Sequence, residues 1–374
     1  MKRGKSYGNR FAVSIGLSAL TSKPSSVMLT ALLSATALFG KTDVPVFLLS
    51  GQSNMAGADA LVSDLTPDQK KTVDSVIIYM DAEGDAAKRC KWLTLGPGFG
   101  STSSNLGPEL FFGRTLADSM KTKIAIIKDA VSAAPLGTAQ NGYLPPSSNG
   151  GTGGTLYKNM LTHIDAAMKS FDTDRYIPRW AGFVWLQGET DAMIQSQTKA
   201  YETNLTNLIN DIRAKTKVAD LPVILPMIDV QTRWTYNSQI RDADVACRQK
   251  LKNVDTMDTK GLPTNGIHYR AQGHVKIGAT CAQRWLSMHF DYGGLPTNVY
   301  NYSRPTAMCL HPSTNTLCIV NVFDMSGRKV TTLNGDWGSY RNPRIPNECF
   351  IIAAVKKSGR HYSVEKFTKI GVQK

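Results

Sequence analysis

The sequence predicts an α/β fold, in which a parallel sheet is covered by helices on both faces, followed by a small β module. From about residue 44 to residue 290, short apolar runs alternate with stretches in which apolar residues recur every three to four positions. That alternation is typical of strand–helix–strand units with a buried parallel sheet. After residue 290 the helical periodicity stops and short strand-like runs follow, which predicts a separate β-rich segment.

Each element of the main domain is predicted from its own pattern. Apolar runs that end in small or polar residues predict strands at residues 44–50, 75–82, 123–131, 181–187 and 221–230. Apolar residues at helical spacing predict helices at residues 107–120, 156–171, 200–216 and 271–290. Two stretches rich in Gly, Ser, Asn and Pro predict long loops at residues 96–107 and 135–155.

The first 40 residues are predicted to be an export segment. Residues 1–41 hold six Lys/Arg and no Asp/Glu, and two apolar runs precede small residues around "SATA", which is the pattern of a secretory signal. Each apolar run is shorter than the roughly 18 residues that cross a bilayer. We therefore expect a secreted or cell-surface protein of bacterial type without a membrane span; a buried N-terminal helix is the alternative.

The C-terminal part is predicted to be a linker, residues 293–305, and a basic β-rich module, residues 306–374. Residues 296–374 hold eleven Lys/Arg against four Asp/Glu, so the module suits sorting, attachment to an anionic or cell-surface partner, or saccharide binding. A solvated basic face without a partner is the alternative. The domain between the two basic ends, residues 41–292, is close to neutral, which argues against a nucleic-acid partner.

Two motifs place reactive groups at strand ends, where the site of a parallel sheet lies. In "GQSNMAG" Ser53 directly follows the strand 44–50, and in "WLQGETDA" Gln187 and Glu189 follow the strand 181–187. A serine nucleophile needs a base, a group that orients the base, and donors for the oxyanion. A turn serine and a helix cap are the alternatives for the two motifs.

A third motif, "GIHYRAQGH", offers the base. His268 lies in a loop just before the last helix, whereas the other histidines fall within helices, at a helix end or in the C-terminal part. Asn265 stands three residues before it. The six cysteines form no C-x-x-C pair, so no zinc ribbon is predicted.

The motifs "GQSNMAG", "LGPELFFG", "WLQGETDA" and "GIHYRAQGH" occur in this order. Together they resemble the SGNH (GDSL-like) hydrolase superfamily, and within it carbohydrate esterase family 6, which includes acetylxylan esterases, and the sialate O-acetylesterase domain. The resemblance covers about residues 44–290. It implies a flavodoxin-like three-layer α/β/α sandwich and the removal of acetyl groups from sugars through an acyl-enzyme, without metal or cofactor.

The resemblance also implies roles for single residues. By position, Ser53 resembles the nucleophile, His268 the base and Glu189 the acid, while the Ser53 amide, the Gln187 side chain and the backbone at Ala133 resemble the oxyanion donors. Two positions depart from the family pattern, since Asn265 stands where an aspartate is common and "SAA" replaces a "GG" near Ala133. Asn265 is therefore expected as an auxiliary residue, and substrate contacts are expected from Gln52, Asn54 and Glu109.

The functional expectation is a secreted acetylxylan esterase acting on acetylated plant polysaccharide or oligosaccharide. Two alternatives stay open: a sialate O-acetylesterase with the same triad, and a weakly active or non-catalytic saccharide-binding surface protein, which the two departures would explain. The segments "VFDMSGRKV" and "GRHYSVEKF" are similar to C-terminal sorting or attachment modules of secreted bacterial proteins.

Overall fold

The computed structural model describes residues 41–292 and four later strands between Cys318 and Ile370. The expected export segment, residues 1–40, and the expected linker, residues 293–305, lie outside the described residues. Among the helices that are described, none is long and apolar enough to cross a membrane.

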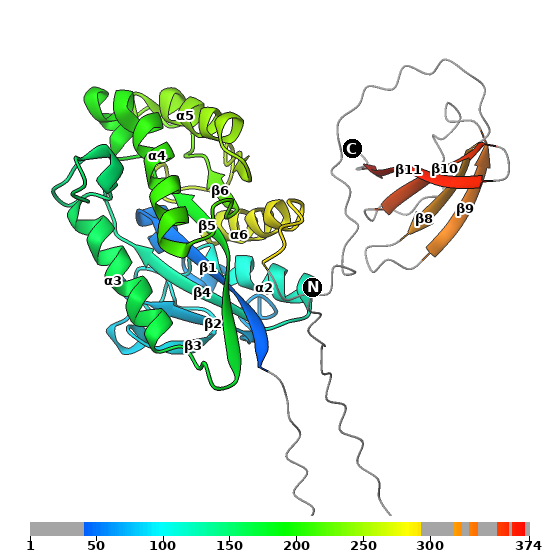
Figure 1. Ribbon diagram of the computed structural model, residues 1–374, viewed down its shortest axis with the longest axis horizontal. Helices are drawn as coiled ribbons and strands as arrows, with labels where there is room; N and C mark the ends of the chain where they lie inside the picture. Colours follow the sequence, from blue (N-terminus) through cyan, green and yellow to red (C-terminus); the bar gives the residue numbers. More distant parts are fainter. Residues whose placement is uncertain (1–40, 293–317, 324–328, 336–349, 359–360, 371–374) are drawn as a thin grey trace, which may run out of the picture. The chain divides into compact units, whose positions relative to one another are not determined.

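Seven strands form the sheet of the main domain in the order β3-β2-β4-β1-β5-β6-β7 (Figure 1). Neighbouring strands are parallel except at one edge, where β2 and β3 pair antiparallel. The predicted parallel sheet is therefore confirmed, with one antiparallel edge strand added. The strands are β1 (Thr42–Gly51), β2 (Val73–Met80), β3 (Trp92–Leu95), β4 (Ile124–Ala130), β5 (Tyr176–Leu186), β6 (Val223–Pro226) and β7 (Val254–Met257).

Helices cover both faces of this sheet, as the central strand β1 shows. Its side chains alternate between two cores, with Phe47 and Leu49 in one and Val46 and Leu48 in the other. All four are at most 1% exposed, and each contributes roughly 1.5–3 kcal/mol by its burial. A strand buried on both faces reads as a continuous apolar run, which is why residues 44–50 were recognisable in the sequence.

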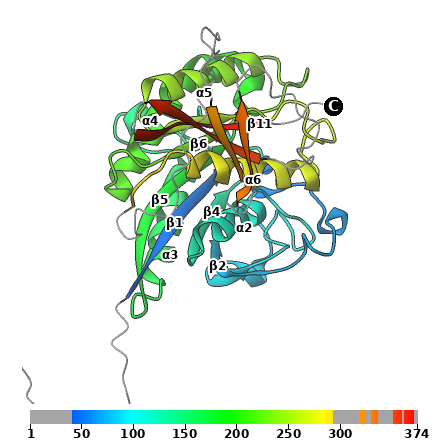
Figure 2. The same cartoon turned by 90° about the vertical axis from the view of Figure 1, so that its right-hand side faces the viewer.

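The first core lies under α2 (Glu109–Met120) and α6 (Ala271–Leu286), which pack side by side (Figure 2). The second lies under α3 (Thr155–Lys169), α4 (Gln195–Thr216) and α5 (Asn237–Lys250). The predicted three-layer α/β/α arrangement is confirmed.

Helix α5 and the strands β3 and β7 were not predicted, and neither were the one-turn helix α1 (Ser53–Ala56) and the short 3-10 helices. Helix α5 is polar over most of its surface and buries only Ile240, Ala243, Asp244 and Cys247. These four residues have helical spacing, but an aspartate among them breaks the apolar pattern. Strands β3 and β7 have four residues each, which is too short for a period of two to stand out.

The carboxyl ends of the central strands meet at one edge of the sheet. Strand β1 pairs with β4 on one side and with β5 on the other, so the chain changes direction across the sheet at β1. Ligands of open α/β sheets bind at such a point, beyond the strand ends. Ser53 lies two residues after the end of β1, Ala133 lies three residues after β4, and Glu189 lies three residues after β5.

The C-terminal strands form a separate antiparallel sheet in the order β11-β10-β8-β9. They are β8 (Cys318–Phe323), β9 (Lys329–Gly335), β10 (Phe350–Ser358) and β11 (His361–Ile370). Strands were expected in this part of the chain. Its limits as a domain and its role in attachment remain predictions.

Candidate active site

Ser53 is held on a sharp strand-to-helix turn. Strand β1 ends at Gly51, and Ser53 is the first residue of the one-turn helix α1 (Ser53–Ala56). A Cβ at Gly51 would lie 2.0 Å from the carbonyl oxygen of Leu186, and the φ of this glycine is +151°. Only glycine allows so close an approach of two backbones. The Ser53 side chain thus stands where β1 leaves the sheet.

His268 approaches Ser53 from the loop between β7 and α6. Its Nε2 lies 3.0 Å from Ser53 Oγ. The loop is shaped by Asn265, whose Oδ1 accepts hydrogen bonds from the backbone N–H groups of Ile267 at 3.0 Å and of His268 at 2.7 Å. The two residues expected as nucleophile and base are therefore in hydrogen-bond contact.

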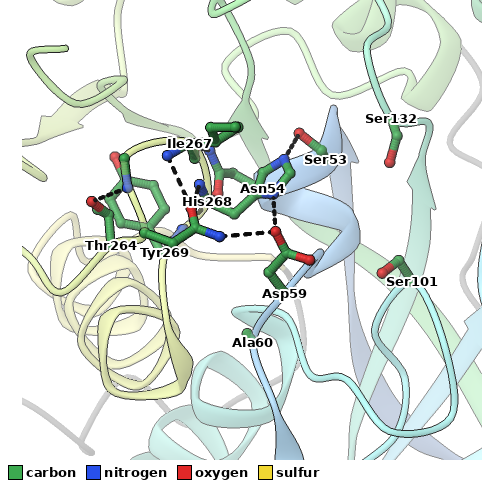
Figure 3. Close-up of polar contacts among 12 residues, drawn as sticks. Ser53, Asn54, Asp59, Ala60, Ser101, Ser132, Thr264, Ile267, His268 and Tyr269 are labelled. Atoms are coloured by element: carbon green, nitrogen blue, oxygen red, sulfur yellow. Dashed lines mark hydrogen bonds and ion pairs between the residues drawn. The ribbon is translucent and has the colours of Figure 1, made fainter.

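The other ring nitrogen of His268 contacts Asp59. His268 Nδ1 lies 2.7 Å from Asp59 Oδ2, and Asn265 Nδ2 donates to the same oxygen at 2.9 Å (Figure 3). The hydrogen bonds from His268 and then Asn265 lower the pKa of Asp59, so this carboxylate stays charged at more acidic pH than a free aspartate. Ser53, His268 and Asp59 form a continuous Ser–His–Asp chain of contacts.

Glu189, the acid expected from the sequence, contacts Asn54 instead of His268. Its Oε1 accepts a hydrogen bond from Asn54 Nδ2 at 2.6 Å, and Asn54 Oδ1 accepts one from the backbone N–H of Tyr269 at 3.0 Å. Burial raises the pKa of Glu189, although the bond from Asn54 opposes the rise. The expected contact between Glu189 and His268 is thus corrected, because the carboxylate that contacts His268 is Asp59. Glu189 instead binds the side chain of Asn54, which in turn binds the backbone of the histidine loop at Tyr269.

Gln187, expected as an oxyanion donor, uses its amide within the protein. Its Nε2 donates to Gln52 Oε1 at 3.1 Å, to the carbonyl oxygen of Ala134 at 3.0 Å and to Asp191 Oδ2 at 2.7 Å. The side chain is 1% exposed. The expected direct role is therefore corrected, because this amide group faces the protein and has no proton left for a substrate.

Gln52 is the residue that can replace Gln187 as an oxyanion donor, because among the described residues its Nε2 has no hydrogen-bond acceptor. Its Oε1 accepts the bond from Gln187 and a second from the backbone N–H of Thr190 at 3.2 Å. Because a backbone N–H can only donate, this contact identifies the oxygen end of the amide. The Nε2 end is left for the pocket, which Gln52 lines.

Ala133 lies in the loop after β4 and lines the same pocket. Its φ is +57°, a left-handed conformation that costs a non-glycine residue roughly 1–2 kcal/mol. A glycine, as in the related motif, would adopt this conformation without strain, so the alanine here takes it at a cost in free energy. Within the described residues, the backbone N–H groups of Ala133 and Ser53 have no hydrogen-bond acceptor.

The pocket in front of Ser53 has a volume of about 250 Å³. Met193 and Ile267, which are 49% and 39% exposed, stand at its rim. The exposed Arg233 and the buried Trp234 also line it. The lining is completed by Gln52, Ser53, Asn54, Ser132, Ala133, Glu189, Thr190 and His268.

A protein-family model described as carbohydrate esterase, sialic acid-specific acetylesterase, matches residues 43–287. The chain belongs to this family. A probable carbohydrate esterase of Arabidopsis thaliana is 24% identical over 262 residues, which are 65% of this chain and 90% of that protein.

One solved structure shares the fold of the main domain. An X-ray structure of an Arabidopsis thaliana protein is 21% identical, covers 66% of this chain and 98% of its own, and has a TM-score of 0.53. The crystal structure of NanS is 16% identical with a TM-score of 0.48, covering 66% of this chain and 98% of its own. The narrower assignment to carbohydrate esterase family 6 stays a prediction.

In this member of the carbohydrate esterase family, Glu109 is a core residue. It is 0% exposed, its Oε2 lies 2.8 Å from Lys128 Nζ, and its Oε1 accepts from the backbone N–H of Gly107 at 2.9 Å. Lys128 also donates to the carbonyl oxygens of Ala56 at 3.1 Å and Phe99 at 2.6 Å. The expected substrate contact of Glu109 is corrected, because the ion pair lies against α1 and neither of its residues lines the pocket.

Breaking this buried pair should cost stability more than substrate affinity. We expect Glu109→Gln to lower the free energy of unfolding by about 3–5 kcal/mol, because it leaves the charge of Lys128 buried without its counter-charge. Urea denaturation measures this loss. The double variant Glu109→Leu with Lys128→Met should recover most of it. A large increase in KM for Glu109→Gln at unchanged stability would contradict the structural role.

Of the residues that sequence reasoning missed, Asp59 is the most important. It lies six positions after Ser53 and has a φ of +61°, just beyond Gly57 with a φ of +87°. A glycine and an aspartate directly after a short helix indicate a reversal of the chain. This reversal was the available signal that Asp59 returns toward the serine.

Proposed function

We propose that the protein is a serine esterase that removes O-acetyl groups from saccharides. The observation that carries the proposal is the chain of two hydrogen bonds, 3.0 Å from Ser53 to His268 and 2.7 Å from His268 to Asp59, at the wall of a pocket of about 250 Å³. Membership of the carbohydrate esterase family supports an acetylated sugar as the substrate class.

The reaction follows from the positions of these groups. His268 Nε2 takes the proton of Ser53 Oγ while that oxygen attacks the acetyl carbonyl carbon. Asp59 stabilises the imidazolium that forms. The imidazolium then gives its proton to the departing sugar oxygen, which leaves an acetyl ester on Ser53. A water molecule, deprotonated by His268, releases acetate and restores the serine.

Three donors suit the negative oxygen of the tetrahedral intermediate. They are the backbone N–H groups of Ser53 and Ala133 and the Nε2 of Gln52, all on residues that line the pocket. Preorganised donors of this kind contribute about 10²- to 10³-fold each to kcat. Gln187 supports these donors without contacting the substrate, because it donates hydrogen bonds to the side-chain oxygen of Gln52 and to the carbonyl oxygen of Ala134.

The direct test is acetate release by the full chain from acetylated sialic acid, acetylated xylan and 4-nitrophenyl acetate. We expect turnover of at least one acetylated sugar and a transient mass increase of one acetyl group on the peptide that contains Ser53. Saccharide binding without any ester turnover would overturn the proposal and favour the non-catalytic reading. Turnover of 4-nitrophenyl acetate alone would overturn the saccharide part.

Arg233 bears on the choice between the two candidate substrates, acetylated xylan and acetylated sialic acid. The motif set predicts acetylated xylan, which is neutral, whereas an exposed arginine at the pocket favours the carboxylate of an acidic sugar such as acetylated sialic acid. A role on exported polysaccharide also requires secretion, which stays a proposal based on the N-terminal segment.

We expect Arg233→Gln to raise KM for acetylated sialic acid by about tenfold, because a charge-assisted hydrogen bond is worth roughly 1.5–3 kcal/mol. KM for neutral 4-nitrophenyl acetate should stay the same. Arg175→Gln is the matched control, since this exposed arginine pairs with Asp172 and does not line the pocket. Equal effects of Arg233→Gln on the charged and the neutral substrate would contradict the assignment.

A further inference from the structure

Residues 131–134, here called the oxyanion turn, are fastened at three points around Ala133. The backbone N–H of Val131 donates to the carbonyl oxygen of Gly51 at 3.2 Å, and Gln187 donates to the carbonyl oxygen of Ala134 at 3.0 Å. The third fastening is Ser132, whose backbone N–H and Oγ both donate to one carboxylate, that of Glu83, at 2.6 Å and 2.8 Å.

Glu83 reaches the oxyanion turn from a loop after a neighbouring strand. It lies in the loop that follows β2, and Gly84 behind it has a φ of +111°. A Cβ at Gly84 would lie 2.8 Å from the carbonyl oxygen of Gly100, so the chain turns tightly there and fixes the direction from which Glu83 approaches. Hydrogen bonds from an N–H and an O–H to a carboxylate are roughly twice as strong as neutral ones.

The loop of Glu83 has a second connection to the same strand end. Asp81 precedes Glu83 by two residues, and its Oδ2 lies 3.2 Å from Nε2 of His163. His163 Nδ1 contacts Asp129, the penultimate residue of β4, and Tyr143 donates to Asp129 at 3.0 Å. The loop after β2 is therefore connected to the end of β4 at two places. Asp81 is connected to Asp129 through His163, and Glu83 binds Ser132 in the oxyanion turn.

We propose that Glu83 is a positioning residue, which holds the oxyanion turn so that the N–H of Ala133 meets the carbonyl oxygen of the acetyl group. This inference rests on the proposed esterase function. Ala133 has a strained left-handed backbone, and such a conformation persists only where its surroundings enforce it. Glu83 supplies two of the bonds that enforce it, without itself lining the pocket.

The variants Glu83→Ala and Glu83→Gln test the proposal as a pair. Loosening one oxyanion donor should lower kcat of Glu83→Ala by about 10- to 100-fold, a fraction of the 10²- to 10³-fold cost of losing the donor, with KM changed less than about threefold. Glu83→Gln should recover most of kcat, because its amide oxygen accepts from the Ser132 N–H while its NH₂ donates to Ser132 Oγ.

Asp85→Ala is the matched control. Asp85 lies in the same loop, and its carboxylate accepts from the backbone N–H of Ala87 at 2.9 Å, away from the oxyanion turn. We expect normal kcat and KM from this variant. A loss of kcat in Asp85→Ala equal to that in Glu83→Ala would show a general effect of the loop and overturn the proposal.

Hydrogen exchange provides a readout that does not depend on turnover. The hydrogen-bonded amides of Val131 and Ala134 should exchange faster in Glu83→Ala than in the wild type, and as slowly as the wild type in Glu83→Gln. Unchanged exchange would overturn the proposal even if the wild type hydrolysed no ester. Faster exchange in Glu83→Ala with an unchanged kcat would also overturn the proposal. It would mean that Glu83 holds the oxyanion turn but that this turn has no effect on the reaction. A wild type inactive on every ester contradicts the proposed function instead.

Discussion

Ser53→Ala is expected to lower kcat for acetate release by about 10⁴- to 10⁶-fold, the range found when the nucleophile of a serine hydrolase is removed. The loss follows from the geometry, because Ser53 Oγ is the oxygen in contact with His268 Nε2. Removal of one small hydroxyl should change the free energy of unfolding by only about 1 kcal/mol. The measurement is acetate release from 4-nitrophenyl acetate and acetylated sugars under saturating substrate.

The control for this variant is Ser63→Ala. Ser63 is exposed, and among the residues that the structure describes its Oγ hydrogen-bonds only to the neighbouring Asp64, at 3.3 Å. We expect it to keep wild-type activity. If Ser53→Ala retained more than a few per cent of kcat while remaining folded, another group would be the nucleophile.

Asp59→Asn is expected to lower kcat by about 10³- to 10⁴-fold, since an amide in this position favours the wrong histidine tautomer and cannot stabilise the imidazolium. The loss should persist across the pH range, because the pKa of Asp59 is lowered by its bonds to His268 and Asn265 and its carboxylate is the charged species in use. The pH–rate profile of kcat measures this effect.

Glu189→Gln is the matched isosteric comparison. Its amide oxygen can still accept the hydrogen bond that Asn54 donates at 2.6 Å, so we expect a loss of about tenfold or less, well below the cost of losing a triad carboxylate. An inactive but folded Glu189→Gln enzyme beside an active Asp59→Asn enzyme would reverse this assignment. The same outcome would restore the acid that the motif suggested.

The sequence predicted well those features that depend on local pattern. Strand β1 is a continuous apolar run because it is buried on both faces, and this run locates Ser53 at a strand end. His268 could be placed because it stands just outside a strongly periodic helix. Each of these inferences needs only a segment of the chain and the geometry of a parallel sheet.

The acid could not be chosen in this way. Glu189, Asn265 and Asp59 all lie in loops at the same edge of the sheet, and only the path of those loops decides which of these side chains meets the histidine. Gln187 shows the same limit. A polar residue at a strand end was expected to face the substrate, yet its amide is directed into the protein, where it supports the groups that line the pocket.

The proposed nucleophile and acid lie on one stretch of seven residues, from Ser53 to Asp59, while the proposed base comes from a loop more than 200 positions later in the chain. The His268 ring contacts both ends of that stretch, Ser53 through Nε2 and Asp59 through Nδ1. Both hydrogen bonds of the ring therefore depend on the position of the same loop. A substitution that displaces the His268 ring therefore affects two contacts at once, whereas Ser53 and Asp59 already lie near each other along the chain.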